Sequence, residues 1–149
     1  MSISNDISTA LGIERAQNPS QLAALSLAYI GDTVYDLFTR TYLVNSTDAP
    51  VHRLHLLSAS MVCAKGQAEA YFRIEPMLTE TELAVFKRGR NAHSGTVPKN
   101  ATVADYHNAT GLETLLGYLY LGGEDERLNY LMQRAFGIEE KNELSEETL

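Results

Sequence analysis

The sequence predicts an all-α fold, and three observations support this prediction. Apolar residues recur at helical spacing through most of the 149 residues, whereas no segment alternates between apolar and polar residues as a half-buried strand does. Capping patterns precede several of the periodic segments, and glycines follow two of them. Because the chain shows no internal repeat and no second domain, we expect a single helical bundle.

The first long helix is predicted to begin at Asn18-Pro19-Ser20-Gln21. This stretch combines a capping residue, a proline at the first helical position and a glutamine three residues after the cap. Apolar residues follow at helical spacing, namely Leu22, Leu25, Tyr29, Val34, Leu37 and Phe38. A second helical pattern covers residues 51–74.

Three further helices are expected. Thr79 and Glu82 form a capping box for a helix that ends near Gly89. Helical patterns then cover residues 102–121 and 125–136, separated by Gly122-Gly123. Residues 89–101, which include two glycines and Pro98, are predicted to form a long loop.

We expect residues 19–137 to form the folded domain. Residues 1–18 are then an N-terminal extension, and residues 138–149 an acidic tail that frays because it has few apolar residues. Cys63 is the only cysteine, and its apolar neighbours predict a buried, unreactive thiol. With no long apolar run and no signal-peptide pattern, we expect a cytoplasmic protein with no membrane contact.

The net charge of −7 argues at first against a nucleic-acid partner. The charges are unevenly distributed, however. Acidic residues gather in residues 124–149, whereas residues 84–104 contain no acid and four cations, Lys87, Arg88, Arg90 and Lys99. A basic stretch therefore persists inside an acidic protein.

Carboxylates stand on two segments that are otherwise apolar. Between residues 22 and 38 the only charges are Asp32 and Asp36, and between residues 109 and 121 the only charge is Glu113. A salt bridge or a helix cap would explain one such residue equally well. Two of them, on segments without lysine or arginine, favour a metal ion between the helices, because hard divalent cations prefer oxygen ligands.

Glycines support this interpretation. Gly31 adjoins Asp32, and Gly111 and Gly117 flank Glu113. A glycine inside a helix costs about 1 kcal/mol relative to alanine, so close packing of the two helices is the natural explanation. Such packing would bring Asp32 and Glu113 together. The four histidines show no zinc-binding spacing, and no phosphate-binding glycine motif is present.

Two segments resemble the signature helices of ribonuclease III enzymes. Residues 27–34, Leu-Ala-Tyr-Ile-Gly-Asp-Thr-Val, are similar to the first signature, and residues 112–121, Leu-Glu-Thr-Leu-Leu-Gly-Tyr-Leu-Tyr-Leu, to the second. Residues 87–92, 98–100 and 109–113 resemble the short subfamily, Mini-ribonuclease III, which lacks a double-stranded-RNA-binding domain. The resemblance covers about residues 20–135.

The resemblance implies a symmetric homodimer that cleaves double-stranded RNA with Mg²⁺. For the short subfamily it implies maturation of precursor large-subunit ribosomal RNA, with a ribosomal protein or the pre-ribosomal particle as a further partner. Asp32 and Glu113 would be the catalytic residues and metal ligands. The RNA-binding residues would be Arg88, Arg90, Asn91, Lys99 and Asn100. A basic loop that is merely solvated would also explain these cations.

The chain departs from the full-length ribonuclease III pattern at two positions. That pattern has carboxylates where this sequence has Ala28 and Thr110. Half of the usual carboxylate cluster is therefore missing. This loss weakens the case for a second bound metal ion more than the case for the first. Asp36 is a candidate outer-shell ligand, although a solvated or salt-bridged side chain is the favoured reading of its position.

Two other functions remain open at this point. One is a non-catalytic RNA-binding or ribosome-assembly factor that kept the fold and lost the activity together with the two acids. The other is a helical dimerisation module without an RNA partner. Metal-dependent cleavage of duplex RNA separates the enzyme from both.

Overall fold

The computed structural model describes residues 2–14, 18–92 and 95–138. Every regular element in this part of the chain is helical, so the predicted all-α fold is confirmed. The elements, with η marking a short 3-10 helix, are α1 (Ile3–Leu11), η1 (Pro19–Gln21), α2 (Ala24–Ser46), α3 (Val51–Val62), α4 (Ala64–Ile74), η2 (Glu75–Met77), α5 (Glu80–Arg90), α6 (Val103–Leu121) and α7 (Asp125–Ala135). None of these helices is long and apolar enough to cross a membrane.

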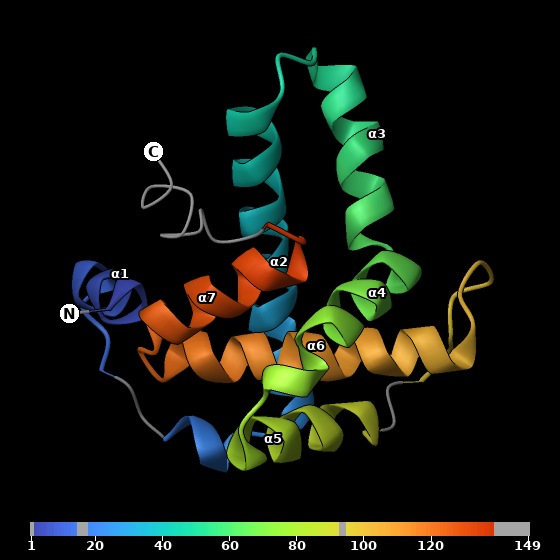
Figure 1. Cartoon of the computed structure of the whole chain (residues 1–149). Helices are drawn as coiled ribbons and strands as arrows, with labels where there is room; N and C mark the ends of the chain where they lie inside the picture. Colours follow the sequence, from blue (N-terminus) through green and yellow to red (C-terminus); the bar gives the residue numbers. More distant parts are fainter. Residues whose placement is uncertain (1, 15–17, 93–94, 139–149) are drawn as a thin grey trace, which may run out of the picture.

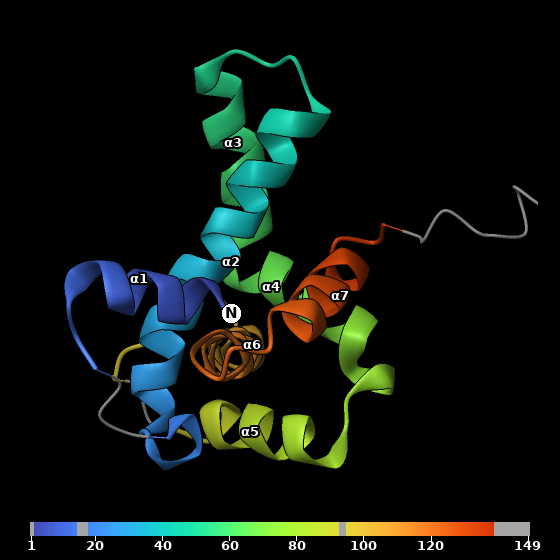
Figure 2. The ribbon, with the colours of Figure 1, turned by 90° about the vertical axis from the view of Figure 1, so that its left-hand side faces the viewer.

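Helix α6 lies at the centre of the molecule. Figure 2 looks along its axis and shows the other helices arranged around it. Because it is surrounded, α6 is apolar on nearly every side, and Leu112, Leu115 and Leu116 are fully buried. Tyr71 of α4 stacks on Phe86 of α5 in the same core, with ring centroids 3.7 Å apart.

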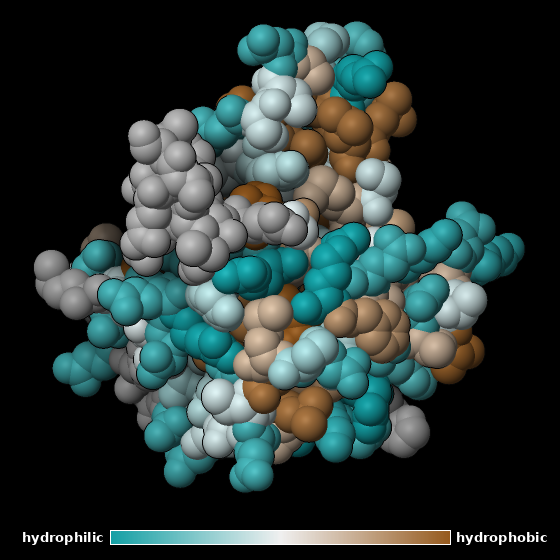
Figure 3. All heavy atoms as spheres, viewed as in Figure 1, coloured by the Kyte–Doolittle hydropathy of each residue, from teal (hydrophilic) through white to brown (hydrophobic). Residues whose placement is uncertain are grey.

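The second half of α2 and the whole of α3 form a helical hairpin that projects from this body (Figures 1 and 2). Helix α2 continues beyond the predicted pattern to Ser46. Apolar side chains lie at the surface of the hairpin, as Figure 3 shows over α3. Leu37 and Val44 of α2 are both 64% exposed. The hairpin therefore presents apolar surface that the described residues do not cover.

The predicted start of the first long helix at Asn18 is wrong, because Asn18 caps a separate short helix. Its side chain does accept a hydrogen bond from the Ser20 N–H, but the turn that it caps is η1, and α2 begins only at Ala24. Leu22 is extended, with φ −76° and ψ 149°. The Arg88 guanidinium donates to the Leu22 carbonyl (2.8 Å), and this long-range contact holds the carbonyl away from a helical ladder.

The predicted helix over residues 51–74 is broken at Cys63. This residue is extended, with φ −65° and ψ 161°, and its Sγ accepts the Gly66 N–H that opens α4. A Cβ at Gly66 would overlap the Ser60 carbonyl oxygen, so the turn folds α4 tightly onto the end of α3. Cys63 is exposed at this corner, and the prediction of a buried thiol is wrong.

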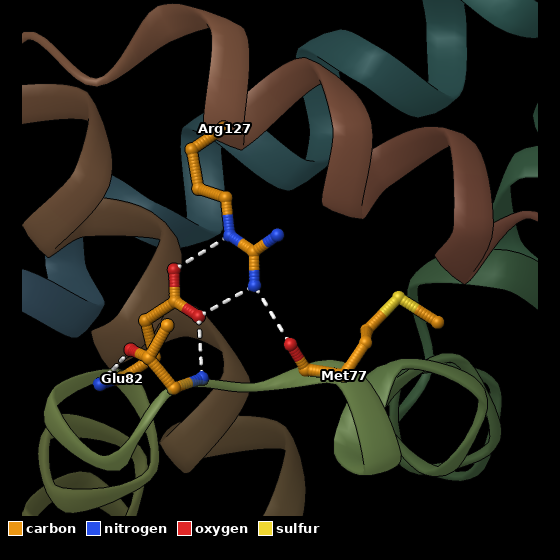
Figure 4. Close-up of polar contacts among 4 residues, drawn as sticks. Met77, Glu82 and Arg127 are labelled. Carbon is orange, nitrogen blue, oxygen red and sulfur yellow. Dashed lines mark hydrogen bonds and ion pairs between the residues drawn. The ribbon is translucent and has the colours of Figure 1, made fainter.

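The predicted capping box of Thr79 and Glu82 is confirmed, and it also has a tertiary role. Arg127 of α7 donates two hydrogen bonds to the Glu82 carboxylate and a third to the Met77 carbonyl, each of 2.8 Å (Figure 4). The bonds from Arg127, stronger than the burial that opposes them, hold the pKa of Glu82 below its usual value. This clamp fixes α7 to the start of α5.

Helix α1 lies within the segment that the sequence presented as an extension. The Ser2 hydroxyl accepts the Asn5 N–H as its N-cap, and the Ile3 N–H donates to Asp125 Oδ2 (3.0 Å) at the start of α7. The short polar pattern of this segment gave no sign of the contact, because its partner lies more than a hundred residues away in the sequence.

Candidate active site

The candidate site lies where α2 crosses α6, and glycines make the crossing close. A Cβ at Gly31 would overlap the Glu113 carbonyl oxygen, and one at Gly117 would overlap the Leu27 carbonyl oxygen. The predicted close approach of these two helices is therefore confirmed. Gly111 belongs to a different contact. A Cβ at Gly111 would lie only 2.5 Å from the ring of Phe86 in α5.

This crossing brings Asp32 of α2 and Glu113 of α6 together, as the sequence predicted. Their side chains are hydrogen-bonded to each other. Burial, and then the charge of Asp32, raise the pKa of Glu113 to about 8. Glu113 is therefore largely protonated at neutral pH. A divalent cation bound between the two carboxyl groups would offset the repulsion between their negative charges. The pKa of Glu113 would then fall, and Glu113 would lose its proton.

The carboxylate pair borders an open cavity of about 590 Å³. Helix α2 contributes one wall, α6 a second, and the start of α4 a third. Pro98 of the segment before α6 also lines the cavity. Asp32 itself is exposed, whereas Glu113 is half-buried, so the pair is reachable from solvent through the cavity.

The donor set fits one hard divalent cation. Both side chains supply carboxylate oxygens, and the cavity leaves room for water and substrate oxygens to complete a coordination shell. Within the described residues no group of three or more histidines, cysteines or acids gathers to hold a metal. Ala28 and Thr110, where full-length enzymes carry acids, also line the cavity, and the Thr110 hydroxyl donates to the Tyr106 carbonyl (3.0 Å).

Asp36 lies one turn further along α2. Arg40 Nε donates to both of its carboxylate oxygens, at 3.2 and 3.1 Å. This ion pair agrees with the salt-bridged alternative that the sequence left open. An outer-shell role for Asp36 stays a prediction.

The predicted RNA-binding residues are divided between a helix and a loop. Arg88 and Arg90 lie in the last turn of α5, which continues one residue beyond the predicted end at Gly89. Basic residues are favoured there by the negative end of the helix dipole. Arg90 Nε donates to Asn91 Oδ1 (3.2 Å). Lys99 and Asn100 are exposed directly after Pro98, at the rim of the cavity. His93 lies outside the described residues.

The sequence analysis assigned no functional role to Gln67 of α4, which lines this cavity. A signal was present. Gln67 shares a helical face with Ala70, Tyr71 and Ile74, all of which are buried. A polar side chain at a core position needs a partner or a ligand, and the pattern of α4 alone would have drawn attention to it.

The fold and the site together define a class of protein. An all-α domain with paired carboxylates beside an open cavity, and with cations near its rim, is suited to a metal-dependent hydrolase that acts on a polyanion.

Comparisons with known proteins narrow this class. A family model described as Ribonuclease III domain matches residues 25–124. A Mini-ribonuclease 3 of Clostridium tetani is 45% identical over 133 residues, 87% of each chain. Another, of a Thermoanaerobacter species, is 46% identical over 120 residues, 80% of this chain and 84% of the relative.

A solved structure gives the same result. The crystal structure of a protein from Fusobacterium nucleatum has a TM-score of 0.73 at 27% identity, covering 82% of this chain and 98% of that one. The chain therefore belongs to the ribonuclease III family, in its Mini-ribonuclease 3 group.

Proposed function

We propose that this protein is a Mg²⁺-dependent endoribonuclease that cleaves double-stranded RNA and matures precursor large-subunit ribosomal RNA. The observation that carries the proposal is the hydrogen-bonded Asp32–Glu113 pair beside an open cavity, in a chain of this family. The role in ribosomal RNA maturation rests on the resemblance to the short subfamily. A ribosomal protein or the pre-ribosomal particle is the further partner that we propose.

Asp32 and Glu113 are the residues that would hold the cation. When bound, the cation lowers the pKa of a water and stabilises negative charge on the phosphate under attack. Glu113 gives up its proton when the site is filled, because a carboxylate must be ionised to act as a ligand. The open side of the cavity admits the RNA backbone, while the crossing of α2 and α6 keeps the two carboxylates in register.

We assign RNA binding to cations of this domain. Arg88, Arg90 and Lys99 are the cations that we assign to phosphate contacts, with Asn91 and Asn100 beside them. A-form RNA exposes backbone and 2′-hydroxyl groups in a shallow minor groove, so recognition follows shape more than sequence.

We also propose that the enzyme is a homodimer. On α2, Leu25, Tyr29, Leu37 and Val44 are exposed, and Tyr29 is 83% exposed. A two-fold axis along such a face would place two equivalent sites in the antiparallel relation of two RNA strands.

One observation favours a second candidate function. Ala28 and Thr110 supply no carboxylate to the cavity, and this is compatible with an RNA-binding or ribosome-assembly factor that no longer cleaves.

Structured precursor RNA, incubated with and without Mg²⁺, separates the two functions. The parent should cut only with Mg²⁺, and Asp32→Asn or Glu113→Gln should lower the rate by about 10³-fold or more, because ligand charge is lost. Asp48→Asn is the matched control, because this exposed acid just after α2 does not line the cavity, and it should keep a near-parent rate. Binding without cleavage by the parent would identify the assembly factor. If the Asp32 and Glu113 variants still cut, the site is misassigned.

A further inference from the structure

Gln67 is a buried amide in the wall of the candidate active site. It lies on the first turns of α4 and is only 4% exposed. Its side chain lines the same cavity as Asp32 and Glu113. No role for it follows from the carboxylate pair itself.

The orientation of this amide is fixed by one hydrogen bond. Gln67 Nε2 donates to the Val62 carbonyl (2.9 Å) at the end of α3. A carbonyl can only accept, so the reverse orientation, with Oε1 facing Val62, would bring two acceptors together. Oε1 must therefore face away from Val62.

Oε1 is left with an unused hydrogen-bonding capacity. Among the described residues it is a buried oxygen with no hydrogen-bond partner. A buried acceptor without a partner destabilises the folded protein, and a hydrophobic residue of the same size would avoid this loss of stability. Methionine would fill this position on the apolar face of α4 without that cost. The amide is therefore poised for a donor that this chain does not supply.

The position of Oε1 restricts which donor can reach it. The atom is buried and belongs to a residue of the cavity wall, so only a small donor could approach it. A ribose hydroxyl is carried on a bulky backbone, whereas a water molecule can enter a narrow space. Waters bound to a divalent cation are strong donors and are held by acceptors in the protein around them.

We infer that Gln67 is a positioning residue whose Oε1 accepts a hydrogen bond from a water in the coordination shell of the cation held by Asp32 and Glu113. This inference rests on the proposed function, because it requires a cation at the carboxylate pair. It assigns to a neutral amide part of the role of the acids that are missing at Ala28 and Thr110. Gln67 contributes an acceptor without adding a third negative charge to an already strained pair.

The test measures metal binding directly, without RNA. Mn²⁺ binding to the intact protein is followed by calorimetry for the parent and for Gln67→Met, which keeps the volume and removes the acceptor. We expect the dissociation constant to rise about 10-fold, the range for loss of a partner around a metal site. Thr39→Val is the matched control, because it removes another buried side-chain bond, to the Tyr35 carbonyl, on the far part of α2.

A second variant should not lose Mn²⁺ affinity as Gln67→Met does. Gln67→Glu keeps an acceptor and adds charge, so it should bind Mn²⁺ at least as tightly as the parent although it loses the bond to Val62. If Gln67 were only structural, both substitutions would lower the thermal midpoint and leave Mn²⁺ affinity unchanged. Equal affinity of Gln67→Met and the parent overturns the inference.

A measurement on the parent removes any dependence on folding of the variants. In protein labelled with ¹⁵N glutamine, the side-chain amide signal of Gln67 should shift on Mg²⁺ addition, and the shift should vanish in Asp32→Asn.

The calorimetry separates the failure of the metal site from the failure of this inference. Mn²⁺ affinity that is equal in the parent and in Asp32→Asn would overturn both the proposed metal site and this inference. Affinity that is lost in Asp32→Asn but unchanged in Gln67→Met overturns the inference alone.

Discussion

At the scale of single residues, the candidate site is governed by the repulsion between two carboxylates. Glu113 is half-buried against Asp32, and both burial and this charge oppose its ionisation. The chain tolerates the unfavourable contact without a neutralising side chain in the described part of the cavity wall. Two acids that bind a metal ion commonly repel each other in the metal-free protein. This repulsion lowers the stability of the metal-free protein, and binding of the cation offsets it.

The pH dependence of metal-free stability follows from the pKa of Glu113. Its pKa is raised in the folded protein to about 8, so folding favours the protonated form. The carboxyl group therefore opposes folding increasingly as pH rises from its usual pKa toward 8, and no further above that value. Glu113→Gln should raise the thermal midpoint by several degrees at pH 8 and change it little at pH 5, measured by calorimetry with a chelator present.

Thr110→Val serves as the control for this prediction, since it changes a neighbouring cavity residue without a charge. A midpoint difference between Glu113→Gln and the parent that is the same at both pH values would contradict the pKa assignment.

At the scale of elements, glycine decides how α2 and α6 meet. Gly31 and Gly117 allow each backbone to contact the other helix directly, and Gly89 of α5 likewise faces Thr114 of α6. Helix α6 can therefore accept close neighbours on two sides. The carboxylate separation is set by this backbone contact, because both acids lie within four residues of a glycine in it.

Gly31→Ala tests this packing. Helix propensity alone predicts that alanine stabilises α2 by about 1 kcal/mol. The added Cβ, however, would overlap the backbone of Glu113, which cannot move aside as a flexible side chain can. Overpacking costs about 1–3 kcal/mol or more, so we expect a net loss in the free energy of unfolding, together with lower Mn²⁺ affinity.

Ser26→Ala, at an exposed position of the same helix, should be neutral or slightly stabilising in urea unfolding. If Gly31→Ala behaves in the same way as Ser26→Ala, the two helices are not held by backbone contact.

At the scale of the whole molecule, an acidic chain has to bind a polyanion. The cations that we assign to this task come from the end of α5 and from the segment directly after Pro98, which lines the cavity. Exposed apolar side chains on the projecting hairpin, such as Leu37 and Val44, do not line the cavity. RNA binding at the cavity and dimerisation through the hairpin can therefore use separate surfaces.

Replacing Arg88, Arg90 and Lys99 together by alanine should weaken RNA binding and flatten its salt dependence. Each lost phosphate contact should reduce the slope of log K against log salt by roughly one unit. Arg53→Ala on the projecting α3 is the control and should leave the slope unchanged. A triple variant with the parent slope, measured by fluorescence anisotropy on duplex RNA, would place the RNA on another surface.

Mixed dimers test the assignment of one site to each strand. A dimer of one parent chain and one Asp32→Asn chain should nick one strand of a duplex and leave the other whole, as seen on a denaturing gel. Cleavage of both strands in one binding event, or of neither, would contradict independent sites.

The sequence by itself determined the all-α class and the ends of α5, α6 and α7. Local signals suffice for these elements, since capping boxes, helical periodicity and glycine pairs act within a few residues. It also determined that Asp32 and Glu113 meet, because two lone acids on apolar helices with adjacent glycines leave few other arrangements.

Only the tertiary structure decided where the remaining breaks and partners fall. The break at Leu22 depends on Arg88, the capping box of Glu82 gains Arg127, and α1 is fixed by Asp125. Each of these contacts joins residues that are 45 or more positions apart in the sequence. The free oxygen of Gln67 likewise follows from the turn at Cys63, where the chain folds α4 back onto α3. Such contacts form between elements that are already folded, so no local pattern of residues encodes them.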